Sequence, residues 1–485
     1  MQHHRCCLLL PSSSVKRRIE WMDAQLFEWC QRLLACRSVT GEGTREIVEL
    51  CAHELLQPHG LEARVIPSQS EGASQANLVC MARGRQHDCA PLILNTHLDT
   101  VPPGDAASWT ECPHGPFVPT FNGERIYGLG AADTKLDFVA KALALIECGT
   151  PRRDVYLIAT FGEEHGLVGA KELAAAGILP RGALAFIGEP SHLQVITAHK
   201  GLMVFELEIE FYPNIDDHEA QQRLPVYYLI FEGRAAHSST PALGVNAIQL
   251  AVDVLERRPD LRIASINGGD AVNKVPARCE VAICGEPGQA VERTARVEQG
   301  RRTCAEFAPS DVFSVLSVLL RELAKFANRA GRPEPDYAAP TLTFNPGVIR
   351  SSRQSILLEF EFRPPPSLPL DEIRQGVAEI VELLSRLYPD HKIRVTERRA
   401  NPAFRSSLEG ETVKLAMAAL AAAYLPLETG VKAGCTEAGI YASKGIVPVV
   451  FGPGPSTGVI HAPNEYNLLS EVEGALRFYR ELLRL

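Results

Sequence analysis

Short apolar runs alternate with helically spaced segments over the first part of the chain. The runs "PLILNTHLDT" (91–100), "DVYLIATF" (154–161) and "ALAFIGEP" (183–190) have the continuous apolar character of buried strands. Apolar residues recur at helical spacing in "TKLDFVAKALALIECG" (134–149) and "LVGAKELAAAG" (167–177). This alternation predicts an α/β domain with a mixed, mostly parallel sheet that is flanked by helices.

The middle of the chain has a different pattern. "LMVFELEIEF" (202–211) alternates apolar and polar residues with period two, as a half-exposed antiparallel strand does. Two strand pairs follow, within 262–283 and 341–366, and helices are predicted over 244–258 and 371–388. The sequence therefore predicts an α+β domain here, and the two strand pairs suggest a degenerate internal repeat.

These patterns divide the chain into segments. Residues 22–198 and 401–485 share the α/β pattern and are predicted to form one domain, with 199–400 inserted as a second. Residues 1–21 precede the first convincing helix, and we expect a disordered leader that ends before Met22.

Two stretches of the inserted domain, 211–230 and 284–310, show no clear periodicity. We interpret both as surface loops.

Composition narrows the range of partners. The 485 residues are 46% hydrophobic and 22% charged, with net charge −9 and a sequence pI of about 5.9. An acidic chain of this kind argues against nucleic acid or an anionic membrane as the main partner. No apolar run reaches the roughly 18 residues that span a bilayer. The 13 cysteines follow no regular framework, which indicates mostly reduced thiols in a cytoplasmic protein.

Polar side chains follow the predicted strands of the first domain, where ligands bind in open α/β sheets. Each of them alone is more often structural than functional. Together they are the oxygen and nitrogen ligand set of a two-metal hydrolase. The residues are His97, Asp99, Asp133, Glu163, Glu164, Glu189 and His461.

Charge counting agrees with two divalent cations. Their +4 is balanced by −3 from Asp133, Glu164 and Glu189 together with one bridging hydroxide, if Asp133 uses both oxygens as a bridge. The remaining glutamate, Glu163, is then free to take the proton from the activated water.

Six motifs in this order resemble the zinc amidohydrolase family of acetylornithine deacetylase, succinyl-diaminopimelate desuccinylase, aminoacylase and the glutamate carboxypeptidases. The motifs are "HLDTVP" (97–102), "GLGAADTK" (128–135), "GEEHG" (162–166), "GEP" (188–190), "AAHSSTPALGVNAI" (235–248) and "HAPNE" (461–465). The resemblance implies a catalytic domain interrupted by a lid domain, and two Zn²⁺ ions with Co²⁺ as an alternative.

The resemblance also implies a role for each site residue. His97, Asp133 and Glu189 would hold one metal ion, and Asp133, Glu164 and His461 the other. Glu163 would be the general acid/base and Asp99 would orient His97. A cis peptide bond is expected at Asp133–Thr134.

A further implied residue is His237, in "AAHSSTP" of the lid. In the family, a lid histidine from the neighbouring subunit stabilises the oxyanion of the tetrahedral intermediate. We therefore expect a homodimer that forms through the lid domain and supplies His237 in trans. Because the lid is enlarged, supply in cis within a monomer is the alternative.

The departures from the family pattern concern the substrate more than the metals. Leu136 and Asp137 follow "DTK" where the family usually has glycine, and "CTEA" (435–438) replaces a "GTDA"-like turn. The leading hypothesis is hydrolysis of an N-acyl amino acid with a free carboxylate, of the acetylornithine or succinyl-diaminopimelate kind. A dipeptidase or carboxypeptidase, favoured by lid length, is the alternative. A catalytically silent metal-binding protein is the non-enzyme alternative.

Overall fold

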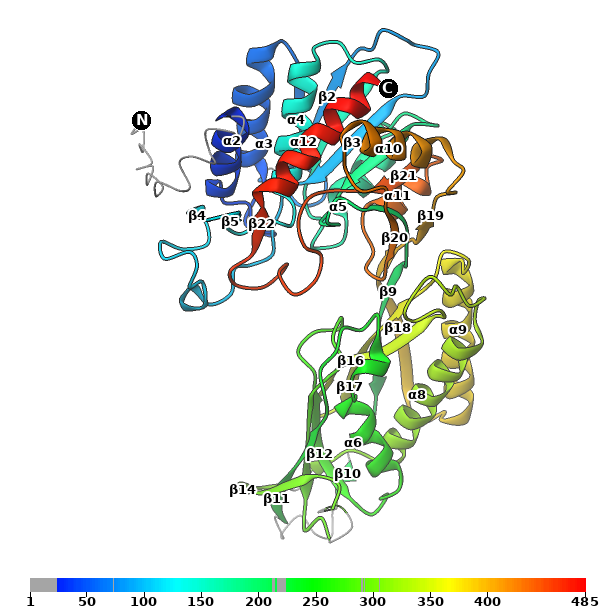
Figure 1. The fold of residues 1–485 in the computed structure, drawn as a ribbon. Coiled ribbons are helices and arrows are strands. Elements are labelled where there is room, and N and C mark those ends of the chain that lie inside the picture. Colours follow the sequence, from blue (N-terminus) through cyan, green and yellow to red (C-terminus); the bar gives the residue numbers. More distant parts are fainter. Residues whose placement is uncertain are drawn as a thin grey trace. The chain divides into compact units, whose positions relative to one another are not determined.

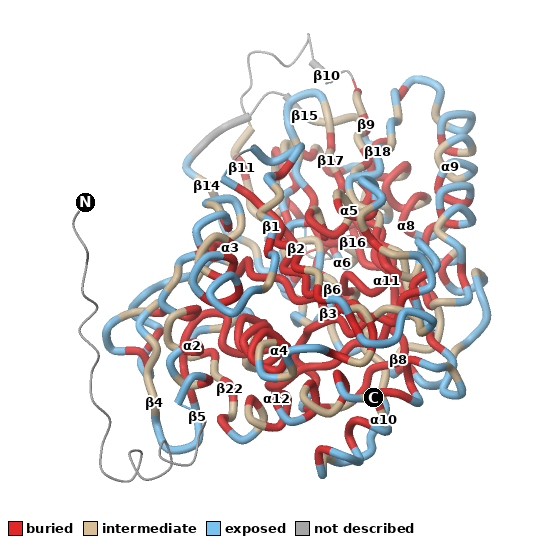
Figure 2. The backbone as a smooth tube through the Cα atoms, turned by 90° about the horizontal axis from the view of Figure 1, so that it is seen from above, coloured by how far each residue is buried: buried red, intermediate tan, exposed pale blue. Residues whose placement is uncertain are grey.

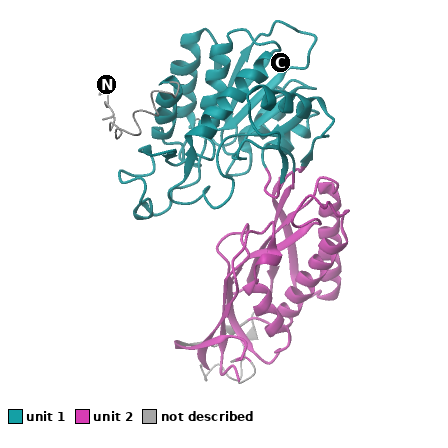
Figure 3. Ribbon diagram, viewed as in Figure 1, with its two compact units in different colours: residues 1–198, 404–431, 436–485 teal, residues 199–403, 432–435 magenta. Residues whose placement is uncertain are grey.

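The computed structural model describes residues 24–72, 74–211, 214–215, 224–288, 291, 293–304 and 306–485. The described chain divides into two compact units (Figure 3). Unit 1 comprises the chain up to Ala198 together with 404–431 and 436–485, and unit 2 comprises 199–403 and 432–435. The predicted leader, 1–21, lies outside the described residues. The assignment of 432–435 to unit 2 was not predicted from the sequence.

A mixed sheet forms the centre of unit 1 (Figure 1). Its central strands, β6, β3, β7 and β21, run parallel, and antiparallel strands extend the sheet on both sides. In spatial order the strands are β1 (Glu62–Pro67), β2 (Ala76–Ala82), β6 (Val155–Thr160), β3 (Leu92–His97), β7 (Leu184–Gly188), β21 (Val447–Val450), β8 (Val195–His199) and β19 (Phe404–Arg405), with β20 (Thr429–Lys432) on β8. A small separate sheet contains β4 (Thr120–Asn122), β5 (Arg125–Tyr127) and β22 (Tyr466–Leu468).

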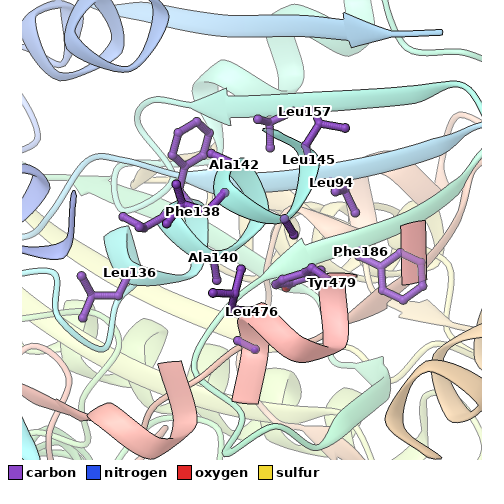
Figure 4. Packing of buried hydrophobic residues seen from close by; sticks show 14 of the residues in the cluster. Leu94, Leu136, Phe138, Ala140, Ala142, Leu145, Leu157, Phe186, Leu476 and Tyr479 are labelled. Carbon is purple, nitrogen blue, oxygen red and sulfur yellow. The ribbon is translucent and has the colours of Figure 1, made fainter. Parts of the chain in front are cut away.

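Helices cover both faces of this sheet, which explains the continuous apolar character of its strands. Successive residues of β3 enter different cores: Leu94 packs with α4 and α12, and Ile93 packs with α5 and α11. Figure 4 shows the first of these cores, and Figure 2 shows α4 as buried over most of its length. The helices of unit 1 are α2 (Ala24–Ala35), α3 (Arg45–Leu50), α4 (Lys135–Cys148), α5 (Val168–Ala175), α10 (Glu411–Ala422), α11 (Ala438–Ala442) and α12 (Leu469–Arg484).

The predicted fold class is confirmed: a helix-flanked mixed sheet accompanies a separate antiparallel α+β unit. Within the described ranges, the helices are all too short or too polar to cross a bilayer. The described cysteines include nine free thiols, while Cys284 is disulfide-bonded.

Unit 2 is built on one eight-stranded antiparallel sheet. Its strands, in spatial order, are β14 (Arg296–Cys304), β11 (Leu224–Glu232), β13 (Arg278–Cys284), β12 (Arg262–Gly268), β16 (Thr343–Ser351), β17 (Ser355–Arg363), β9 (Leu202–Glu210) and β18 (Lys392–Asn401). The helices α6 (Ala247–Glu256), α8 (Asp311–Arg329) and α9 (Leu370–Leu387) share one apolar core with the sheet. The two short strands β10 (Asn214–Ile215) and β15 (Glu306–Phe307) pair separately.

The eight strands form two halves with the same internal order. The first half, β11, β12, β13 and β14, places its strands from the outer edge inward as fourth, first, third and second in chain order. The second half, β9, β16, β17 and β18, repeats that order, and the halves meet where Asn267 and Gly268 of β12 pair with Arg350 and Ile349 of β16. The first half lies in the chain between β9 and α8, so one copy is inserted into the other. The internal repeat suggested by the sequence is therefore a repeat of the whole four-stranded unit.

The interpretation of 211–230 and 284–310 as surface loops was wrong in part. Residues 224–232 form β11, a strand with neighbours on both sides, and residues 296–304 form β14 at the edge of the sheet. Arg296, Glu298 and Arg301 of β14 are exposed, because an edge strand with a solvated face accepts charge. A polar edge strand has little of the apolar alternation by which strands are recognised.

Helix α8 was missed in the sequence although its signal is clear. Val312, Leu316, Leu319 and Leu323 recur at helical spacing and are all buried. The stretch before this helix is polar and was predicted as a loop that ends at residue 310, directly before the helix begins at Asp311.

Candidate active site

The carboxyl ends of three parallel strands bring predicted site residues to one edge of the unit 1 sheet. His97 ends β3 and lies opposite Thr160, which ends β6. Glu163 follows shortly after β6, and Glu189 directly follows β7, the neighbour of β3 on its other side. One ligand atom from each of His97, Glu163 and Glu189 can be chosen so that all lie within 4.8 Å of one another.

Asp133 lies between two imidazoles. Its Oδ1 is 3.0 Å from His97 Nε2, and its Oδ2 is 3.3 Å from His461 Nε2. His461 Nε2 also lies 3.0 Å from Oε1 of Glu164. Asp133 precedes helix α4, and the peptide bond Asp133–Thr134 is cis, as expected from the sequence. A carboxylate whose two oxygens face two different histidines has the arrangement that a bridging ligand requires.

The residues form two potential metal sites. Asp133, Glu164 and His461 make one, and His97, Glu163 and Glu189 make the other. The second differs from the expected set, which has Asp133 in place of Glu163. Asp133 also contacts His97, so the geometry is compatible with either assignment. A general base has to lie close to the water that it deprotonates, and a metal-bound water would lie beside the metal ligands. Glu163 lies beside those residues and so satisfies the condition.

The electrostatics of the site favour a cation. Burial and the negative charge of Glu189 raise the pKa of the Glu163 carboxyl well above its usual range, although His97 opposes this. Burial also raises the pKa of Glu164, against the opposing effect of His461. Hydrogen bonds to Asp133 and Glu164 raise the pKa of His461 to about 11. Crowded carboxylates beside imidazoles that face them are a donor set that fits divalent metal ions.

Asp99 connects both halves of the site. It is fully buried; His97 Nδ1 lies 3.0 Å from its backbone carbonyl oxygen and 3.6 Å from its Oδ1. The backbone N–H groups of Glu163 and Glu164 donate to its two carboxylate oxygens, at 3.1 and 3.3 Å, and Thr40 Oγ1 donates at 2.8 Å. Asp99 therefore fixes the backbone of the glutamate pair as well as lying beside the imidazole of His97.

Glu465 was not singled out as a site residue by the sequence reasoning. It is buried, and its Oε1 accepts hydrogen bonds from the backbone N–H groups of Ala132 at 2.9 Å and Asp133 at 3.0 Å. It thereby joins the segment of His461 to the loop of Asp133. The signal was its place as the last residue of the "HAPNE" motif.

His237 lies in unit 2, between β11 and α6. Its Nδ1 accepts a hydrogen bond from the backbone N–H of Ser239 at 3.2 Å and lies 2.6 Å from Ser239 Oγ. The structure thus gathers all the predicted site residues of unit 1 in one place, whereas the catalytic role of His237 remains a prediction.

A protein-family model describes most of this chain. The model for peptidase family M20/M25/M40 matches residues 93–485. The chain belongs to this family. Members named in the comparisons are peptidases and deacetylases, so the chain is a hydrolase that acts on amide bonds.

The relatives found by sequence are named as deacetylases, whereas the neighbours found by structure are named as peptidases. The chain is 30% identical to an acetylornithine deacetylase of Klebsiella pneumoniae (strain 342) over 314 residues, which is 55% of this chain and 75% of the relative. An aminoacylhistidine dipeptidase from Vibrio alginolyticus superposes with a TM-score of 0.66 at 16% identity, covering 95% of this chain and 96% of the other. An M20 metallo-carboxypeptidase from Sulfolobus solfataricus gives a TM-score of 0.58 at 17% identity, covering 95% and 99%. These structural matches establish the fold, and the predicted family is confirmed.

We predict that His461→Ala and Glu164→Ala each weaken one metal site. Either change removes one donor atom from the group that includes Asp133. After dialysis, metal per chain measured by atomic emission should fall toward one ion, and excess zinc should restore part of the activity. His165→Ala is the matched control, because His165 is exposed and adjacent to Glu164. Unchanged metal content in both site variants would contradict the assignment.

Proposed function

We propose that this member of the M20/M25/M40 family is a dinuclear zinc hydrolase that cleaves the amide bond of an N-acyl amino acid. The observation that carries the proposal is the division of the adjacent glutamates: Glu164 lies beside His461, and Glu163 lies with His97 and Glu189. His97, Asp133, Glu164, Glu189 and His461 would hold two Zn²⁺ ions, or Co²⁺. The ions would lower the pKa of a bound water, so that it can lose a proton near neutral pH, and they would polarise the amide carbonyl.

Glu163 is the proton carrier in this proposal. It accepts a proton from the attacking water and later gives it to the leaving amine. Burial and the charge of Glu189 favour its protonated form, so the carboxyl can hold the proton between the two steps. The carboxylate of Asp99 keeps Glu163 in place through the backbone N–H of that residue, and the backbone carbonyl oxygen of Asp99, 3.0 Å from His97 Nδ1, orients the imidazole.

The proposed substrate is a small N-acyl amino acid with a free carboxylate. Support comes from the sequence relatives named acetylornithine deacetylase, which are 29–30% identical to this chain. The proposed reaction would belong to amino-acid metabolism in the cytoplasm. Thiols stay reduced in that compartment, which agrees with the free cysteines of unit 1.

Dipeptide hydrolysis is the second candidate, and the doubled lid sheet favours it. The deacetylase alignment covers 55% of this chain, whereas the dipeptidase structure from Vibrio alginolyticus covers 95%. An amide bond is cleaved in either case, so the site in unit 1 serves both reactions.

The doubled lid also bears on the oligomeric state. The expected homodimer would supply His237 from the lid of a partner. In this chain the half that carries His237 is an inserted copy of the half that joins directly to unit 1. We therefore favour the alternative, in which the inserted half takes the place of the partner's lid and His237 acts in cis.

A substrate screen tests the reaction. The zinc-loaded protein is offered N-acetyl and N-succinyl amino acids, including N-acetylornithine, together with dipeptides, and the released amine is measured. Deacylation at the highest kcat/KM is expected. Preference for dipeptides would replace the lead with the second candidate, and a fully metal-loaded protein without turnover on any class would indicate a silent metal-binding protein.

Glu163→Gln should abolish turnover while metal content stays near that of the parent. Loss of the proton carrier costs about 10²–10⁴ in rate. Glu164→Gln provides the contrast, because it should lower metal content as well as activity. Retention of more than about a tenth of the parent kcat in Glu163→Gln would exclude Glu163 from the role, given that range.

His237→Ala should keep the metal and lose about 10²–10³ in kcat, as removal of an oxyanion donor does. Mixing Glu163→Gln with His237→Ala then separates cis from trans supply. In cis, the mixture stays inactive. In trans, half of the exchanged dimers are mixed and carry one intact site of two, so activity should return to roughly a quarter of the parent value. Such recovery would overturn the cis proposal.

A further inference from the structure

A buried ion pair lies directly behind the strand ends that carry His97 and Glu189. Asp137 and Lys141 are one turn apart on α4, both side chains are fully buried, and Lys141 Nζ is 2.7 Å from Asp137 Oδ2. We propose that this pair positions His97 and Glu189 for metal binding. The inference rests on the proposed function in taking these two residues as metal ligands.

Lys141 is bound to the end of β3 and to β7. Its ammonium donates to the carbonyl oxygen of Asn95 at 2.6 Å and to Thr96 Oγ1 at 2.9 Å, and these are the two residues before His97. It also reaches the carbonyl oxygen of Phe186 in β7 at 3.2 Å. One cation therefore connects the two neighbouring strands just before their carboxyl ends.

Asp137 contacts the same strand ends from its own side. Thr96 Oγ1 donates to Asp137 Oδ2 at 2.7 Å, and Tyr479 OH of α12 donates to Oδ1 at 2.7 Å. A Cβ at Gly188 would lie 2.0 Å from Asp137 Oδ2, so the residue before Glu189 approaches this carboxylate as closely as a glycine allows. Figure 4 shows Tyr479 in the surrounding apolar core.

Stability alone does not account for a charged pair at this position. From Leu136 to Leu145, the other residues of α4 are apolar and buried. Burying two charges costs desolvation, and apolar residues of similar size are often as stabilising or more so. Apolar residues cannot supply directional hydrogen bonds. Here those bonds end on Asn95 and Thr96, just before His97, and on Phe186 in the strand that precedes Glu189.

The pair acts on one of the two metal sites. Its bonds reach the strands of His97 and Glu189, whereas Glu164 and His461 make up the other group with Asp133. Partners that orient a ligand typically contribute a factor of about 10–100 in metal affinity. Loss of the pair should therefore weaken one site by that factor and leave the other near its parent value.

The test replaces both charges at once, because either alone would leave an unpaired buried ion. The double variant Asp137→Leu with Lys141→Met keeps the volume of the pair, and its Co²⁺ binding is followed by visible absorption in a two-site titration of the full chain. We expect one site to weaken about 10–100-fold and the other to change less than about twofold. Leu143→Ala, a buried apolar change on the same helix, is the control and should leave both affinities unchanged.

Three results would overturn the inference: a folded double variant with parent affinities at both sites, equal weakening of both sites, or the same loss in Leu143→Ala. If the double variant does not fold, Tyr479→Phe is measured instead, since it removes one hydrogen bond to Asp137 and keeps the ring. It should weaken the same site at least about threefold, below the range for complete loss, and parent affinity would again overturn the inference. Because the readout is metal affinity, a parent that binds metal without turnover refutes the proposed reaction and not this inference.

Discussion

Four carboxylates lie close together near the carboxyl ends of β6, β3 and β7: Asp133, Glu163 and Glu189 are buried, and Glu164 is half-buried. They cannot all ionise at close quarters without positive charge among them. His97 and His461 supply two cations when protonated, and metal ions in place of those protons would satisfy the same negative charge. The remainder of unit 1 holds these groups close together against their repulsion.

Several segments distant in sequence provide that support. Asp99 accepts hydrogen bonds from the backbone of the glutamate pair, and Glu465 accepts them from the backbone of Asp133. Glu465 lies in the second part of unit 1, which the chain reaches only after unit 2. Although unit 1 is interrupted, its site is complete, because the returning segment brings both His461, a predicted ligand, and Glu465, which binds the backbone of Asp133.

The sequence predicted the parts of this arrangement that depend on local pattern. Parallel strands that end in His97, Glu163 and Glu189 could be inferred from apolar runs followed by polar residues, since such ends share one edge. The contacts of Asp137 and Lys141 could not, because a buried charge in an apolar helix has no sequence signature that identifies its partners. The partners of Glu465 could not either, because they are backbone N–H groups more than 300 residues away in the chain. Strand β14 was missed for a related reason: its exposed edge tolerates charge, so its sequence resembles a loop.

The sequence suggested the repeat in the lid only as two strand pairs, whereas the topology shows that it comprises two four-stranded halves. Half of the eight-stranded sheet is inserted between β9 and α8 of the other half, so the second copy is split around the first. Only the strand order, with second strands β12 and β16 meeting at the centre, reveals that both halves are built alike. β12 and β16 are each paired on both sides within this chain, so neither offers a free edge to a second copy. The edges of the described sheet lie instead at β14 and β18, so a second chain that extended this sheet would have to pair with one of those two strands.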